Sequence, residues 1–232
     1  MSKILLHFAA AAGLAFAIAS GVSAAADATP KATDILFEGK HIAGVAPGTE
    51  LMYKFVRKPT DEKILGKGYS DDISVKVESD AATAGKKNVL VQMFTGDRAK
   101  DPQRITDMDG NPMLIVFLDT ALGHFRQLAG GDPSYLKNRF SSSYAKPDAK
   151  VEPVKISYKG AEHEGYRVSV SPFANDASRA KMRGFENAEF SIVLSEKIPG
   201  HFALMTANYA NTQKGAPSLV ETMTLDGVGD IK

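Results

Sequence analysis

Cysteine and tryptophan are both absent from the 232 residues of this chain. The lack of cysteine excludes disulfides, thiol catalysis, a cysteine-based metal site and lipid attachment to a cysteine behind a signal peptide. The lack of tryptophan removes the largest aromatic platform for stacking on sugars, which weighs against a glycoside hydrolase. A chain of this length buries enough apolar surface to be stable without disulfides.

An excess of charge of either sign is also missing, because 28 Lys and Arg residues stand against 27 Asp and Glu residues. All of them except Lys3 follow residue 26, so the remainder carries no formal net charge. Without a clustered basic face we expect no nucleic-acid partner. No apolar run after residue 26 is long enough to span a bilayer, and we expect a product that does not cross the membrane.

The first 26 residues have the pattern of a secretory signal peptide. Lys3 precedes an apolar run over residues 4–18, and a stretch of small residues follows that run. The run is too short and too interrupted for a transmembrane anchor. We expect cleavage after Ala24 or Ala26 and a periplasmic protein, with secretion from the cell as the alternative.

Behind a polar lead-in over residues 27–48, residues 49–232 are expected to form a single α+β domain. Alternation of apolar and polar residues predicts antiparallel strands with one polar face. About eight such strands are expected, and they cover residues 51–56, 73–78, 89–94, 154–158, 166–170, 190–194, 202–206 and 219–225.

Between the third and fourth of these strands the periodicity becomes helical. Apolar residues three and four apart predict a helix over residues 113–128, with Asn111 and Pro112 at its start and Gly130-Gly131 at its end. A shorter second helix is predicted over residues 132–139. Because the first half of the long helix is apolar on all sides, we expect the sheet to curl around it as a half-barrel.

Short catalytic and metal-binding motifs are present only in part. Ser134 and Lys137 match the Ser-x-x-Lys of penicillin-recognising enzymes, whose other signatures are absent. The turn over residues 107–111 begins like a calcium loop, but Pro112 and Leu118 occupy the positions that require Gly and Glu. Neither motif is complete enough to predict its chemistry.

Histidines and neighbouring carboxylates are not spaced to converge on one point. The histidines after residue 26 are His41, His124, His163 and His201. None forms a helical i, i+4 pair with another, and the acidic residues beside His163 lie in a predicted hairpin turn. Asp71 and Asp72 are neighbours near a predicted strand, so they face opposite sides. We therefore expect no metal, no cofactor and no enzymatic activity; an unrecognised hydrolase is the alternative.

The order of strands, helix and strands over residues 50–226 resembles the half-barrel of periplasmic lipoprotein and lipid carriers, the LolA/LolB-like group. Residues 190–200 also resemble a strand and turn of exported bacterial proteins. The resemblance implies a non-enzymatic carrier of a lipid, an acyl chain or a hydrophobic peptide. It transfers no site residues to this chain.

In such a carrier the ligand would lie between the sheet and the central helix, against apolar and adaptable side chains. The candidate lining residues are Leu114, Phe117, Leu118, Leu122, Phe125, Met93 and Met205. The alternative is a structural or interaction domain with a filled core and a protein partner in the cell envelope. A cavity between sheet and helix distinguishes the two.

Overall fold

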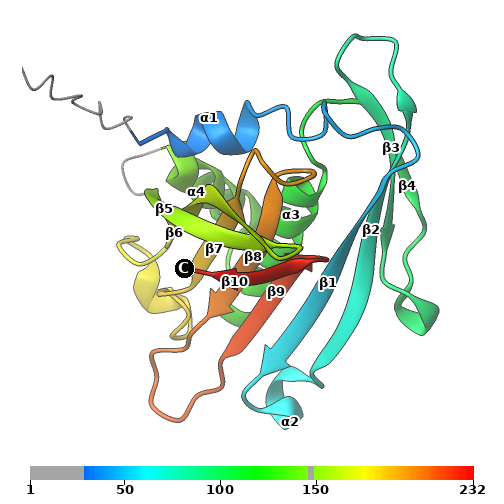
Figure 1. The fold of residues 1–232 in the computed structure, drawn as a ribbon. Helices are drawn as coiled ribbons and strands as arrows, with labels where there is room; N and C mark the ends of the chain where they lie inside the picture. Colours follow the sequence, from blue (N-terminus) through cyan, green and yellow to red (C-terminus); the bar gives the residue numbers. More distant parts are fainter. Residues whose placement is uncertain (1–28, 146–148) are drawn as a thin grey trace, which may run out of the picture.

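The computed structural model describes residues 29–145 and 149–232 (Figure 1). The predicted signal peptide, residues 1–26, lies outside the described residues. The described chain forms an open, curled antiparallel sheet with helices against it, which confirms the α+β class. Its strand order is β10-β5-β6-β7-β8-β9-β1-β2-β3-β4, so the described residues contain ten strands rather than the predicted eight.

The strands are β1 Glu50–Pro59, β2 Tyr69–Asp80, β3 Lys87–Met93, β4 Gln103–Met108, β5 Lys150–Tyr158, β6 Ala161–Val170, β7 Glu189–Leu194, β8 Phe202–Tyr209, β9 Leu219–Leu225 and β10 Val228–Ile231. The helices are α1 Ala32–Phe37, α2 Glu62–Leu65, α3 Met113–Ala129 and α4 Pro133–Ala145, with 3₁₀ turns at Gly96–Arg98 and Arg179–Lys181. Most neighbouring strands are consecutive in the chain, but α3 and α4 separate β4 from β5, and the pairs β9–β1 and β10–β5 join distant segments.

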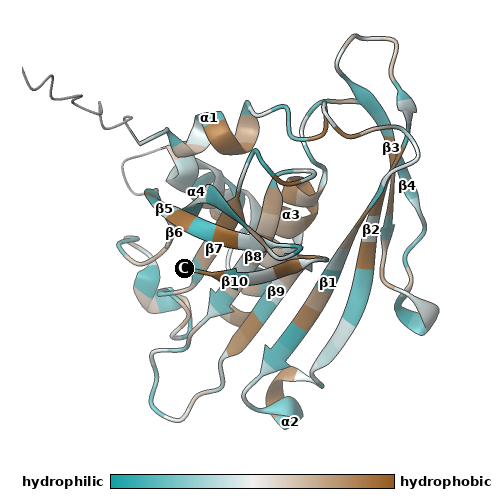
Figure 2. Cartoon of the chain, in the orientation of Figure 1, coloured by the Kyte–Doolittle hydropathy of each residue, from teal (hydrophilic) through white to brown (hydrophobic). Residues whose placement is uncertain are grey.

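Alternation along the strands places apolar side chains on one face, which we call the inner face. In β1, Tyr53 is fully buried, whereas its neighbour Lys54 is exposed and forms an ion pair with Asp72 on β2. Tyr53 also pairs with Ile73 on β2 and Leu225 on β9, and both are buried. Figure 2 shows the resulting bands of hydrophobic and hydrophilic residues along β1 and β2.

The central helix α3 begins at the predicted residue, Met113, and ends at Ala129, one residue beyond the prediction. Oδ1 of Asn111 accepts a hydrogen bond from the backbone N–H of Met113 at 3.0 Å, and Gly130 ends the helix with a φ of 76°. One face rests on the inner face of the sheet, where the Tyr209 hydroxyl donates to the carbonyl of Ala121. The helix is not buried on all sides, however, because the side chain of Ile115 is 53% exposed.

The second helix, α4, continues to Ala145, beyond the predicted end at residue 139. Ser142 and Ser143 donate their hydroxyls to the carbonyls of Arg139 and Phe140. Such bonds satisfy a serine inside a helix. Burial of Tyr144 extends the packed side of α4 by another turn.

The hairpin between β5 and β6 differs from the prediction in the position of its turn. The turn is made by Lys159 and Gly160 alone, both with positive φ, so β6 begins at Ala161. The residues Glu162–Glu164 therefore lie in a strand. The lead-in over residues 27–48 likewise contains a helix, α1, where the sequence predicts only an irregular segment.

Candidate functional site

The residues predicted to line a cavity lie mainly in the core. Buried members are Leu114, Phe117, Phe125 and Met205, and half-buried members are Leu118, Leu122 and Met93. Beside Phe117, the space between α3 and the sheet has a volume of about 10 Å³. This is close to the minimum that holds one water molecule. A ligand there would require α3 to move away from the sheet, and the role of these residues stays a prediction.

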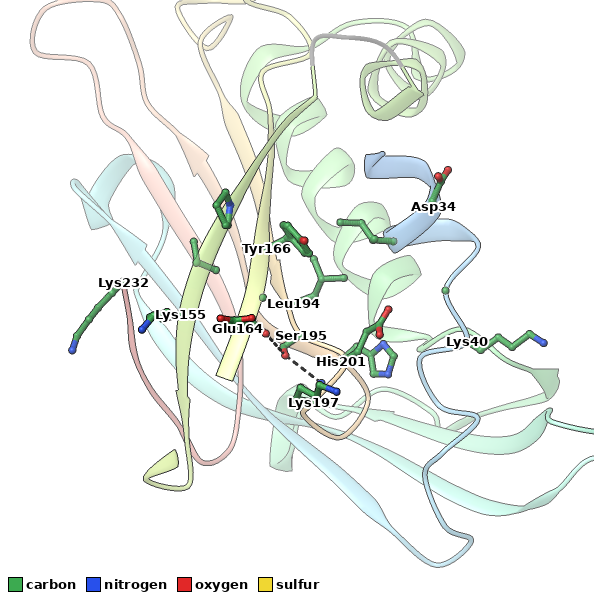
Figure 3. A pocket seen from close by; sticks show the side chains of 16 residues that line it. Asp34, Lys40, Lys155, Glu164, Tyr166, Leu194, Ser195, Lys197, His201 and Lys232 are labelled. Atoms are coloured by element: carbon green, nitrogen blue, oxygen red, sulfur yellow. Dashed lines mark hydrogen bonds between the residues drawn. The ribbon is translucent and has the colours of Figure 1, made fainter. Parts of the chain in front are cut away.

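A larger hollow lies elsewhere, between α1, the β5–β6 hairpin and the turn that joins β7 to β8. Its volume is about 750 Å³, and we call it the groove. Residues of four chain segments form its wall, 34–40, 153–155, 164–166 and 194–201, together with Lys232 (Figure 3). None of the seven predicted lining residues is among them.

Apolar side chains form the middle of the groove. The apolar lining comes from α1 with Ile35, from the hairpin with Val154 and Tyr166, and from the end of β7 with Leu194. Figure 3 shows Tyr166 and Leu194 next to each other. Val154 and Leu194 are buried, whereas Ile35 and Tyr166 are half-buried. This arrangement offers a surface on which a hydrophobic chain would lose contact with water.

Charged residues of both signs surround this apolar middle. Lys197 and His201 lie together next to the β7–β8 turn, Lys40 stands on the α1 side, and Lys155 and Lys232 stand on the β5 side (Figure 3). The acidic residues of the wall are Asp34, Glu164 and Glu196. The nearly balanced charge suits a ligand with an apolar body and a polar end.

Hydrogen bonds fix the floor of the groove. The Ser195 hydroxyl donates to the backbone carbonyl of Glu164 at 2.6 Å and accepts from the backbone N–H of Lys197 at 3.2 Å. Gly165 of β6 also lines the groove, and a Cβ added to it would be 2.3 Å from the carbonyl oxygen of Leu194. Only glycine therefore allows β6 to approach β7 this closely.

Two histidines that are far apart in the sequence meet at one end of the groove. The rings of His41 and His201 stack edge to face with their centroids 5.3 Å apart. Nε2 of His41 donates to the carbonyl of Ile35 at 2.8 Å, and Nδ1 accepts from the backbone N–H of Asn111 at 3.3 Å. Burial lowers the pKa of both histidines, so the neutral ring that this hydrogen-bond pattern requires is favoured.

The Asn111 side chain joins this end of the groove to the core. Its amide donates to the hydroxyl of Tyr53 at 2.9 Å and to the carbonyl of Gly200 at 2.8 Å. One residue thus holds the start of α3, strand β1 and the β7–β8 turn together. Sequence reasoning assigned Asn111 only the role of a helix cap.

The remaining motif residues do not converge on the groove. Ser134 and Lys137 are exposed on α4, and neither of them lines the groove. Asp71 and Asp72 face opposite sides, as predicted, since Asp71 is buried against Arg98 whereas Asp72 binds Lys54. Among residues 29–145 and 149–232, no group of three His, Asp or Glu side chains is placed to hold a metal ion.

Comparison with known proteins gives no family assignment. No protein-family model matches the chain, and no curated protein matches it. A structural match is the crystal structure of the Mycobacterium tuberculosis lipoprotein LppX, at 8% sequence identity and a TM-score of 0.28. The match covers 79% of this chain and 90% of that chain. At this similarity neither fold nor function can be transferred to this chain.

Proposed function

We propose that this protein is an exported, non-enzymatic binding protein that holds a hydrophobic chain, such as the acyl chain of a lipid or lipoprotein, in the groove. The observation that carries the proposal is a hollow of about 750 Å³ whose middle is apolar and whose rim is charged. Pockets for small molecules and cofactors usually measure about 300–1,000 Å³ and combine an apolar wall with a few polar groups.

Binding would be driven by the apolar area that leaves water, at about 25 cal/mol for each Å². The chain of the ligand would lie on Ile35, Val154, Tyr166 and Leu194, and its polar end would face the charged rim. The signal-peptide pattern over residues 1–26 supports export to the periplasm. No helix of the described residues is long and apolar enough to cross a membrane.

The missing tryptophan allows a direct test, because one introduced indole is then the only one in the protein. Tyr166→Trp places it in the groove wall, and Ile64→Trp places it on α2, where Ile64 is 67% exposed and outside that wall. Both variants, without residues 1–26, are titrated with a dodecanoic acid that carries bromine at its terminal carbon. Bromine quenches an indole only at close contact.

We expect saturable quenching of Tyr166→Trp below the micelle concentration and none of Ile64→Trp. Native mass spectrometry of unmodified protein from a bacterial periplasm then identifies the lipid class that co-purifies. Equal quenching of the two variants, or none in either, would overturn the proposal.

The alternative is a structural or interaction domain of the cell envelope, and the nearly filled space between α3 and the sheet favours it. An apolar surface is available for such a role, because Phe37 and Ile115 are 49% and 53% exposed and line one hollow. An apoprotein that binds no acyl probe, but whose binding to an envelope protein is abolished by Ile115→Lys, would favour this alternative.

A further inference from the structure

The short helix α1 borders hollows on three sides. Asp34 and Ile35 line the groove, whereas the preceding residues 29–33 line a second hollow of about 330 Å³ against α4 and β5. Phe37 lines a third hollow of about 180 Å³ between α3 and α4. Tyr144 of α4 lies in the wall of both smaller hollows. Each hollow thus ends against α1.

Few contacts hold the body of α1 in place. The helix has only six residues, and no side chain caps its N-terminus. Helices this short are not stable on their own, so α1 depends on its tertiary contacts. Only Ala32 and Leu36 of the helix are buried, while the ring of Phe37 is half exposed and touches Tyr144 by its edge.

His41, which follows α1 in the chain, forms hydrogen bonds to α1 and to the start of α3, and we call it the latch. The residue is buried, with 2% of its surface exposed, and its ring packs at a tilt against Phe202 at a centroid distance of 4.6 Å. One ring nitrogen binds the Ile35 carbonyl inside α1, and the other binds Asn111 at the start of α3. The backbone N–H of Ile42 donates to the carbonyl of Asp109, which holds the next residue in the same place.

We infer that α1 is a gate: when His41 releases Ile35, the helix moves outward and joins the groove to the hollow beneath Phe37, forming one continuous site for a long acyl chain. The ligand part of this inference rests on the proposed function. The extended site would include Leu118 and Leu122, two of the residues that the sequence predicts as cavity lining.

The opening of α1 is measured without ligand, by amide hydrogen exchange in the protein without residues 1–26. We expect His41→Ala to speed exchange over residues 31–40 by about tenfold or more while the amides of β8 remain protected. The matched control is His163→Ala, on the β5–β6 hairpin and outside the latch. Unchanged exchange over residues 31–40, or an equal increase in β8, would overturn the gate.

A second variant tests the gate without weakening the core. This variant combines Phe37→Cys with Ile115→Cys. The two replaced residues are exposed and line the same hollow, and the chain has no other cysteine. Joining the two thiols with a short bis-maleimide fixes α1 to α3. We expect cross-linked protein to bind hexadecanoic acid at least about tenfold more weakly than the uncross-linked variant, and octanoic acid equally well.

The possible results separate the two proposals. Equal affinity for hexadecanoic acid with and without the cross-link overturns the gate but leaves binding in the groove intact. If neither acid binds in any form, the proposed function fails and so does the acyl-chain part of the inference. The exchange result still decides independently whether His41 holds α1 closed.

Discussion

The carboxylate of Glu221 on β9 lies 2.6 Å from Nδ1 of His124 on α3 and joins the helix to the inner face of the sheet. The same carboxylate faces the Arg57 guanidinium at 3.5 Å, and it lies 3.4 Å from the Tyr209 hydroxyl, whose proton is donated to the Ala121 carbonyl. Its side chain is only 4% exposed. A buried charge of this kind is tolerated because it is partnered from several sides.

Replacing Glu221 with alanine should therefore destabilise the protein by about 3–5 kcal/mol, because the Arg57 charge loses its buried partner. The measurement is urea unfolding near neutral pH. A matched control is Glu152→Ala, which removes an ion pair with Lys150 whose side chains are 43% and 69% exposed. That pair should contribute less than about 1 kcal/mol. Similar losses for both variants would contradict this account of the cluster.

Much of the sheet could be predicted because most of its strands alternate regularly between apolar and polar residues. The two strands that the prediction missed lack this pattern. β4 is a largely exposed edge strand, and its register on β3 depends on pairs such as Val91 with Gln103. β10 has only four residues and is held partly by reciprocal backbone hydrogen bonds between Lys155 and Lys232. Both depend on partners that local periodicity does not show.

The groove could not be predicted for a similar reason. Its wall combines residues 34–40 with residues 194–201, which are about 160 positions apart. His41 meets His201 because the β7–β8 turn lies against the segment that follows α1, and this contact leaves no spacing signal in the sequence. Apolar periodicity correctly identified the buried side of α3, but a buried side chain in a filled core and one in a cavity have the same pattern.

Two glycines with different surroundings should respond to alanine in opposite ways. Gly123 lies on the exposed side of α3 with nothing within 4 Å of an added Cβ, so Gly123→Ala should stabilise by about 0.5–1 kcal/mol. Gly165→Ala would place its Cβ 2.3 Å from the Leu194 carbonyl and should destabilise by about 1–3 kcal/mol or more. Thermal unfolding of both variants measures the two signs; stabilisation by Gly165→Ala would mean that β6 and β7 are less close than described.

The buried carboxyl of Asp71 should contribute to stability in weak acid. Burial alone would raise its pKa, but hydrogen bonds from Thr95 and Arg98 outweigh burial and lower the pKa from 3.8 to about 2. The contribution is therefore complete above pH 3.8 and is lost as the pH falls towards 2. We expect the stability difference between the wild type and Asp71→Asn to shrink over this window. Asp230→Asn, at an exposed position, is the control for the removal of one carboxylate.

The His41 latch should weaken at a higher pH than the Asp71 contacts. Burial lowers the pKa of His41 below 6.5, and this outweighs the opposing effects of the Ile35 carbonyl and of the nearby Asp109 and Glu196 carboxylates. The folded protein thus binds fewer protons than the unfolded chain, so the stabilisation is complete above pH 6.5 and is lost as the pH falls below it. Protonation also places a hydrogen on Nδ1, which then cannot accept from the Asn111 N–H.

Acid should accordingly open α1 before it unfolds the sheet. In hydrogen exchange corrected for the intrinsic effect of pH, residues 31–40 should lose protection as the pH falls below 6.5, while β8 stays protected. His41→Gln should show little of this pH dependence, whereas His201→Gln should retain most of it, because only His41 binds the Ile35 carbonyl. If His201→Gln rather than His41→Gln abolishes the pH dependence of exchange over residues 31–40, then His201 and not His41 holds α1 closed.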